Sequence, residues 1–130
     1  MRKLKLQVQM SVDGFIAGPN GEMDWITFAW DDALKAYVTG ITDPVDCIVL
    51  GRKLAAGFIP HWAARPADED DAAIDKMNAT PKVVFTRTLE KSVWPNTAVA
   101  RGDLSEEINR LKRAPGGDII AYGGGTFASS

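Results

Sequence analysis

Short apolar runs separated by helix-like stretches are the feature that most limits how this chain can fold. Three runs, residues 45–50 (VDCIVL), 82–86 (KVVFT) and 118–122 (DIIAY), are short enough for strands and apolar enough for burial on both faces. Residues 97–100 form a weaker fourth run. Strands that alternate with helices build a largely parallel sheet. The sequence therefore predicts a single α/β domain over residues 1–130, with helices on both faces of the sheet.

Helix signals fill the gaps between these runs. Apolar side chains at helical spacing predict a helix over residues 28–38, which Gly40 can end. Acidic side chains crowd the start of residues 68–78, where the helix dipole favours them. Asp103, followed three residues later by a glutamate, forms a capping box that opens another helix.

Two further segments are less regular. Residues 4–10 alternate apolar and polar side chains, which predicts a strand with one face buried more than the other, ending at the turn pair Asp13–Gly14. Residues 54–56 indicate a short helix, and Pro60 and Pro66 bracket a loop after it.

Composition excludes several classes of function. A formal net charge of -2 gives no basic excess for binding nucleic acid. No segment has the apolar length of a membrane helix, and the N-terminus lacks the apolar core of a signal peptide. The single cysteine, Cys47, has no partner for an internal disulfide, so a cytoplasmic location is the default.

Two segments have the same pattern: a buried strand ends in glycine, and a helix begins there. They are residues 49–53 (VLGRK) and 121–126 (AYGGGT). Glycine lets a ligand approach the backbone, and a helix start offers free N–H groups and a partial positive charge that suit phosphate. Two such sites at strand ends suggest a ligand with a pyrophosphate, such as a dinucleotide. The alternative is that the glycines only form tight strand-to-helix turns.

Thr86 and Arg87, at the end of the strand over residues 82–86, are a third candidate. A hydroxyl and a guanidinium at a strand end can bind a further phosphate, or they can belong to a solvated loop. None of the three segments matches the GxGxxG or Walker patterns, so neither a Rossmann domain nor a P-loop enzyme is indicated.

Together these segments resemble the dihydrofolate-reductase-like superfamily, most closely the branch that includes the reductase domain of the riboflavin-pathway deaminase–reductase. The resemblance extends in order and spacing along essentially the whole chain. Its four motifs lie at residues 10–17 with Gly21 and Asp24–Trp25, at residues 49–53, at residues 84–89 and at residues 122–126. It implies a dihydrofolate-reductase-like fold and NADPH-dependent hydride transfer to a small flat nitrogen heterocycle, pterin- or pyrimidine-like. The alternative is a non-catalytic module that keeps the nucleotide-binding scaffold and acts through binding or assembly.

The resemblance also implies which residues hold the cofactor. Ile16 and Ala17 would line the nicotinamide side, and Arg52 would lie near the 2′-phosphate, which favours NADPH over NADH. The glycine loop would pack against the pyrophosphate and the nicotinamide ribose. The full set of implied NADPH-binding residues is Ile16, Ala17, Gly51, Arg52, Lys53, Thr86, Arg87, Gly123, Gly124, Gly125 and Thr126.

Three departures from the family pattern affect these expectations. Leu54 stands where the pattern usually has threonine, so one hydroxyl contact to phosphate is missing. A pterin-binding carboxylate is expected near Asp31 or Asp32, and Asp31 is the candidate proton donor, with water as the alternative source; both can also be simple first-turn acids of a helix. The family continues past the glycine loop with a helix and strands, whereas this sequence stops at Ser130. The resemblance therefore predicts a C-terminally truncated domain whose open sheet edge associates as a homodimer.

Four other residues have a structural and a functional interpretation. Cys47 lies inside an apolar run and is expected in the core. His61 is expected to be a loop histidine packed on Trp62, although it can also stack near a substrate. Trp25 and Trp30 can cover a pocket for a flat heterocycle or pack in the core. With one histidine and one cysteine, no metal site is expected.

Overall fold

A parallel sheet organises the part of the chain that the computed structural model describes, which is residues 2–16, 18–20, 31–67, 69–88, 91, 94–122 and 127. Every strand pair described is parallel. The described strands lie in the order β1 (Leu4–Leu6), β5 (Asp118–Ala121), β2 (Val45–Gly51), β3 (Lys82–Phe85) and β4 (Thr97–Ala100). The predicted α/β architecture with a mainly parallel sheet is confirmed.

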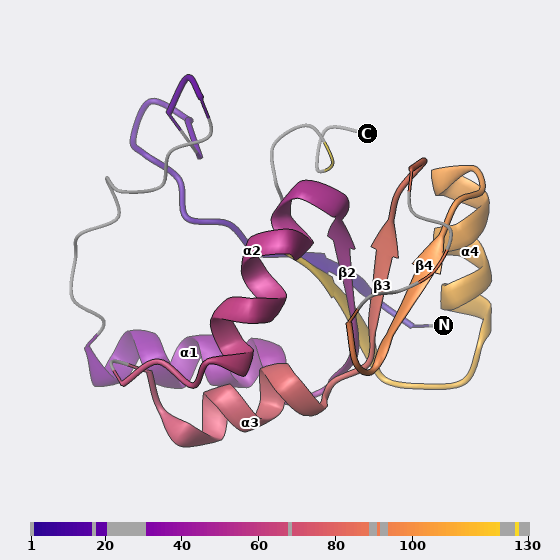
Figure 1. Cartoon of the computed structure of the whole chain (residues 1–130). Coiled ribbons are helices and arrows are strands. Elements are labelled where there is room, and N and C mark those ends of the chain that lie inside the picture. The colour runs from indigo at the N-terminus through magenta and orange to yellow at the C-terminus, as the bar shows by residue number, and fades with distance from the viewer. Residues whose placement is uncertain are drawn as a thin grey trace.

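Helices cover both faces of this sheet (Figure 1). One face, called here the α2 face, packs against three helices, and the other, called the α4 face, packs against one. The described helices are α1 (Asp32–Thr42), α2 (Arg52–Ala63) and α3 (Asp71–Ala79) on the α2 face and α4 (Leu104–Arg113) on the α4 face. None of these helices is long and apolar enough to cross a membrane.

Strand β2 lies at the centre of the sheet and supplies both halves of the core. Ile48 and Leu50 are fully buried on the α2 face, while Cys47 and Val49 are buried on the α4 face. This alternation confirms that the run over residues 45–50 is buried on both faces. Burial also raises the pKa of the Cys47 thiol, as expected for a core cysteine.

Helix α2 is longer than the sequence predicted. It runs from Arg52 to Ala63 and contains Pro60, which was expected to begin a loop. Proline removes one helical hydrogen bond and disfavours helix. Here the packing outweighs that cost, because apolar side chains spaced along one helical face contact the core on both sides of the proline: Leu54, Ala55, Phe58, Ile59 and Trp62.

Three other boundaries also differ from the prediction. Helix α1 continues through Gly40 to Thr42, whose hydroxyl donates to the carbonyl of Val38 at 3.1 Å and helps to close the last turn. Helix α3 begins at Asp71, with Asp70 as its N-cap. Strand β1 is only three residues long, and its leucines are 45% and 56% exposed because nothing in the described structure fully covers them on the α4 face.

Ion pairs close the edge of the sheet at which the strands begin. Arg2 pairs with the carboxylate of Asp46 and donates through Nε to the carbonyl of Gly117 at 2.9 Å. Lys5 pairs with Asp118 at 2.7 Å, and this hydrogen bond lowers the pKa of the Asp118 carboxyl. These ion pairs therefore hold the beginnings of the strands together.

Candidate cofactor site at the carboxyl edge of the sheet

The parallel register brings the predicted motifs to one edge of the sheet. Gly51 at the end of β2 is opposite Phe85 at the end of β3, and Val49 is opposite Ala121 at the end of β5. Residues 51–53 and 86–87 therefore follow neighbouring strand ends. Ligands of open α/β sheets bind beyond such carboxyl ends, so the shared position supports a common site.

The start of α2 is a ready site for an anion. Gly51 is the N-cap with an extended backbone, no side chain caps the helix, and its first turn contains no acid. The first N–H groups of a helix have no partner within it and carry a partial positive charge. Arg52 and Lys53 are both exposed and add two formal cations. This combination favours a phosphate group.

Phe127 explains why residue 51 is glycine. A Cβ added at Gly51 would lie 3.1 Å from the Cβ of Phe127, closer than side chains normally approach. Phe127 in turn lies beside Phe85, with ring centroids 5.5 Å apart. The tight packing that the sequence offered as an alternative is thus one role of Gly51.

After β2 the chain enters α2 on the α2 face, while the Phe127 side chain packs on the α4 face. Open α/β sheets bind ligands beyond the carboxyl ends of their strands, and Arg52 lies at this edge of the sheet.

Thr86 and Arg87 lie in different settings. The Thr86 hydroxyl is buried and accepts a hydrogen bond from the backbone N–H of Thr88 at 3.1 Å. It therefore helps to form its own turn. Arg87 is exposed and follows the strand beside Gly51, so it adds a third cation to the same edge.

Asp31 caps helix α1. Its carboxylate accepts a hydrogen bond from the backbone N–H of Leu34 at 2.8 Å, and the side chain is exposed. Asp32 follows in the first turn, where the helix dipole favours an acid. The structural alternative for these two residues is confirmed, and a part for Asp31 in proton delivery stays a prediction.

Comparison with known proteins supports the resemblance deduced from the four motifs. The family model described as the RibD C-terminal domain matches residues 2–130. The chain belongs to this family. At the level of the family, it is grouped with the reductase domains of riboflavin biosynthesis enzymes.

One relative and two solved structures illustrate the match. The Bacillus subtilis (strain 168) protein YyaP is 32% identical over 133 residues, which cover 99% of this chain and 66% of YyaP, so the chain spans slightly less than two thirds of that relative. A putative riboflavin biosynthesis protein from Shewanella sp. PV-4 superposes with a TM-score of 0.66 at 19% identity, over 98% of this chain and 67% of the other.

The second structure is a diaminohydroxyphosphoribosylaminopyrimidine deaminase/5-amino-6-(5-phosphoribosylamino)uracil reductase from Thermotoga maritima. It superposes with a TM-score of 0.58 at 20% identity, over 95% of this chain and 39% of that protein. At these identities the two structures establish the fold, and they confirm that this RibD C-terminal domain has the expected architecture.

Among the described residues of this RibD C-terminal domain, Ile16 lies away from this edge (Figure 1). Ile16 is half-buried in the turn after β1, which is held by a hydrogen bond of 2.8 Å from the N–H of Ser11 to the carbonyl of Phe15. Figure 1 shows this segment running away from the sheet and from the start of α2. Several predicted residues lie outside the described part of the chain: Ala17, Gly21, Asp24, Trp25, Trp30, Asp68, Leu89, Gly123, Gly124, Gly125 and Thr126.

Two residues at the edge were missed as functional candidates. The side-chain oxygen Oε1 of Gln7 and the hydroxyl of Tyr122 are buried, and neither has a hydrogen-bond partner in the described structure. Burial raises the pKa of Tyr122 to about 12. Tyr122 opens the fourth motif, whereas Gln7 resembled an ordinary polar position of an alternating strand, so the sequence contained a signal for only one of them.

His61 occupies a different setting from the expected one. It lies within helix α2 and not in a loop, because that helix extends past Pro60. Its ring meets the edge of Trp62 with centroids 5.2 Å apart, which confirms the predicted aromatic contact. The side chain is exposed.

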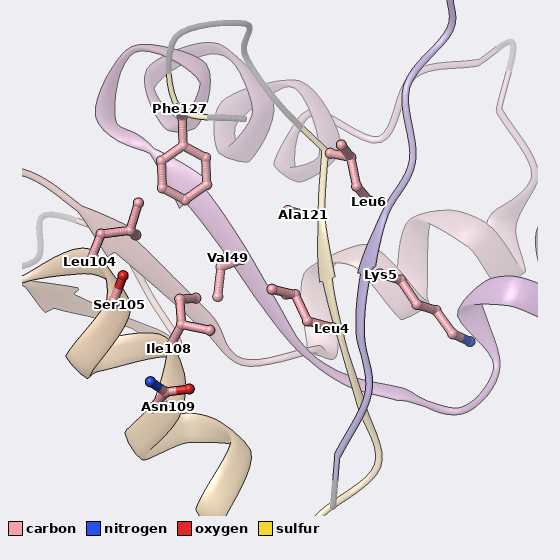
Figure 2. A pocket seen from close by; sticks show the side chains of 10 residues that line it. All are labelled: Leu4, Lys5, Leu6, Val49, Leu104, Ser105, Ile108, Asn109, Ala121 and Phe127. Atoms are coloured by element: carbon pink, nitrogen blue, oxygen red, sulfur yellow. The ribbon is translucent and has the colours of Figure 1, made fainter. Parts of the chain in front are cut away.

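A hollow lies on the α4 face of the sheet (Figure 2). It has a volume of about 410 Å³ and lies between β1 and α4. Most of its wall is apolar. The residues that line it are Leu4, Lys5, Leu6, Val49, Leu104, Ser105, Ile108, Asn109, Ala121 and Phe127.

Proposed function

We propose that this RibD C-terminal domain binds NADPH and transfers hydride to a small flat nitrogen heterocycle of the pterin or pyrimidine kind. The observation that carries the proposal is the cationic edge, where Arg52, Lys53 and Arg87 follow two neighbouring parallel strands beside an uncapped helix start. The family supports a reductase in general terms. The use of NADPH and the class of substrate are the new parts of this proposal.

The residues of this edge fit a phosphorylated dinucleotide. The N–H groups after Gly51 suit the pyrophosphate, and the exposed guanidinium of Arg52 suits the 2′-phosphate. Arg87 adds charge toward the adenosine end. The glycine loop at residues 123–125, together with Thr126, would complete the site as in the family pattern. A 2′-phosphate has negative charge that NADH lacks, so three cations favour NADPH.

The cofactor supplies the hydride, and the protein binds, orients and shields the reactants. The carboxyl edge of the sheet would position the nicotinamide beside a substrate. The carboxylate of Asp31 is already bonded to the N–H of Leu34 and is exposed. In this proposal the proton that accompanies hydride transfer comes from water or from Asp31.

Fluorescence and absorbance separate binding from turnover. NADPH is titrated into the purified protein and its nicotinamide fluorescence is followed, after which oxidation of NADPH is measured with dihydrofolate and with 5-aminouracil derivatives. The proposal expects saturable NADPH binding and oxidation by at least one of these heterocycles. Binding without turnover would favour the non-catalytic alternative, and the absence of binding would contradict both.

A further inference from the structure

Gln7 and Tyr122 lie side by side at the end of the first strand pair. Leu6 is opposite Ala121, and the N–H of Gln7 donates to the carbonyl of Ala121 at 3.0 Å. The next residues in this parallel register are Gln7 and Tyr122. Both follow the carboxyl ends of their strands. Tyr122 follows β5, which is next to β2 and the proposed cofactor site, and Gln7 follows β1, one strand further away.

The two side chains point to the same face of the sheet. Lys5, two residues before Gln7, donates to the carbonyl of Ile41 in α1 at 3.1 Å, which defines the α2 face. Side chains two residues apart on a strand share a face. Tyr122 packs on Phe58 of α2, with ring centroids 5.4 Å apart and planes inclined by 26°. Gln7 and Tyr122 are therefore neighbours on the α2 face, where the ring of Tyr122 stacks on that of Phe58.

Their polar atoms are exceptions in this protein. Buried polar side chains elsewhere in the described structure have partners: the ammonium of Lys82 donates to the carbonyl of Thr80 at 3.0 Å, and the Thr80 hydroxyl donates to the carbonyl of Lys76 at 2.6 Å. By contrast, Oε1 of Gln7 and the hydroxyl of Tyr122 are buried and unpaired among the described residues. Leaving such groups unpaired is costly, and proteins retain them mainly where a ligand or water completes them.

We propose that Gln7 and Tyr122 recognise the –NH–C(=O)– edge of the flat heterocycle that this reductase domain takes as substrate. The ring N–H would donate to Oε1 of Gln7, and the ring carbonyl would accept from the hydroxyl of Tyr122. The stacked pair of Phe58 and Tyr122 gives the apolar surface that a flat ring needs. The inference rests on the proposed function and adds to it the chemical edge by which the substrate is selected.

The hydroxyl of Tyr122 is suited to donate. Burial raises its pKa to about 12, so it stays protonated throughout the neutral range. An apolar ligand would leave both polar atoms unpaired, and a site built around polar partners discriminates strongly against such a ligand. Gln7 and Tyr122 thus select for rings with a lactam edge, a feature that pterins and oxopyrimidines share.

Two fluorescent probes test this inference with the intact chain. Lumazine (pteridine-2,4-dione) contains the lactam edge, whereas 1,3-dimethyllumazine has the same ring without its N–H donors. Each is titrated into the wild type in the presence and absence of NADPH. We expect lumazine to bind on the order of tenfold more tightly than the dimethyl compound, the scale of one lost hydrogen bond to a buried partner. Equal binding of the two, or no binding of lumazine, overturns the inference.

Variants assign the effect to the two side chains. Gln7→Leu removes the acceptor for the ring N–H, so it should reduce lumazine affinity on the order of tenfold while changing dimethyllumazine affinity little. Tyr122→Phe removes the donor to the ring carbonyl, which both probes keep, so it should reduce the affinity of both on the order of tenfold. Tyr37→Phe, on the exposed face of α1, is the matched control and should change neither. A Gln7→Leu variant that keeps the wild-type preference for lumazine, or a Tyr122→Phe variant that binds both probes as the wild type does, would contradict the proposal.

NADPH binding distinguishes this failure from failure of the proposed function. Titration of NADPH into the same variants reports whether the cofactor edge is intact, because neither residue belongs to the cationic cluster. Normal NADPH affinity with equal binding of the two lumazines overturns only the assignment of Gln7 and Tyr122. If the wild type does not bind NADPH, the proposed cofactor is wrong. The comparison of lumazine with dimethyllumazine then still tests whether Gln7 and Tyr122 bind the lactam edge.

Discussion

At the scale of single residues, the proposed cofactor preference depends on the charge of Arg52. Its guanidinium is exposed at the start of α2, free for a phosphate to approach. Arg52→Gln should weaken NADPH binding by about 1–3 kcal/mol, the range of charge-assisted hydrogen bonds, and leave NADH binding nearly unchanged. Fluorescence titration with both cofactors measures the difference. Arg113→Gln, at the C-terminal end of α4, removes the same single positive charge away from the site and is the control. Equal losses for NADPH and NADH would contradict the assignment to the 2′-phosphate.

The buried hydroxyl of Tyr122 makes a prediction about alkaline pH. Its pKa is raised from 10.0 to about 12 in the folded state, so between these values the unfolded chain releases a proton that the folded chain keeps. Stability contributed by this group is complete below pH 10 and is lost as the pH rises toward 12. The free energy of unfolding should fall by about 2 kcal/mol over that window. Urea denaturation in this pH range should show a shallower fall for Tyr122→Phe. Parallel curves for the two proteins would mean that the hydroxyl ionises freely.

Some site residues could be predicted from sequence and others could not. Arg52 and Arg87 follow apolar runs directly, so their place at strand ends was visible in the spacing. Gln7 was not visible, because an alternating strand normally turns its polar positions toward water, whereas the Oε1 atom of Gln7 is buried. Asp31 was visible as a candidate, but the sequence did not show its structural role: its carboxylate accepts a hydrogen bond from the N–H of Leu34 and caps α1.

At the scale of elements, local signals predicted well and packing explains the rest. The predicted N-cap was correct, since the Asp103 carboxylate accepts a hydrogen bond from the N–H of Glu106 at the start of α4. Pro60 and Gly40 misled the prediction, because each is a local helix breaker within a helix that tertiary contacts hold. Strand β4 was predicted with its observed bounds, while β1 was predicted too long.

The cap of α4 supplies a test of this local account. The Asp103 carboxylate accepts a hydrogen bond from the N–H of Glu106 at 3.1 Å. Asp103→Ala should lower the free energy of unfolding by about 0.5–2 kcal/mol, whereas Asp103→Asn, which keeps a capping oxygen, should lose much less. Thermal or urea unfolding followed by circular dichroism gives both values. Similar losses in the two variants would show that charge, and not the cap, stabilises the helix start.

At the scale of the whole molecule, the parallel sheet was predictable and the strand order was not. Alternation of strands and helices implies parallel pairing, but the position of β5 between β1 and β2 depends on contacts far apart in sequence. The approach of Phe127 to Gly51 is one such contact. It assigns Gly51 a packing role that the motif alone left open.

The exposed side of β1 leads us to predict self-association. Leu4 and Leu6 are 45% and 56% exposed beside the apolar hollow on the α4 face, and β1 is an edge of the described sheet (Figure 2). Unpaired edges and exposed apolar patches favour association, so we propose that a second copy of this chain covers them. Light scattering at low micromolar concentration should give a mass near twice 14.1 kDa.

Charge on this surface tests where the copies meet. Leu6→Lys should shift the protein toward monomer, whereas Val12→Lys, at a fully exposed position in the loop after β1, should not. A monodisperse wild-type monomer would contradict the predicted dimer. A dimer unaffected by Leu6→Lys would place the interface elsewhere.

The central claim is that the carboxyl edge of the sheet holds the cofactor, and nuclear magnetic resonance tests it most directly. Titrating NADPH into the ¹⁵N-labelled chain reports on each backbone amide. The account predicts that the amide signals of residues 51–53 and 86–87 shift as NADPH saturates the protein, while those of Asp46 and Gly117 at the opposite edge do not. Shifts confined to that opposite edge, or no shifts at any NADPH concentration, would contradict it.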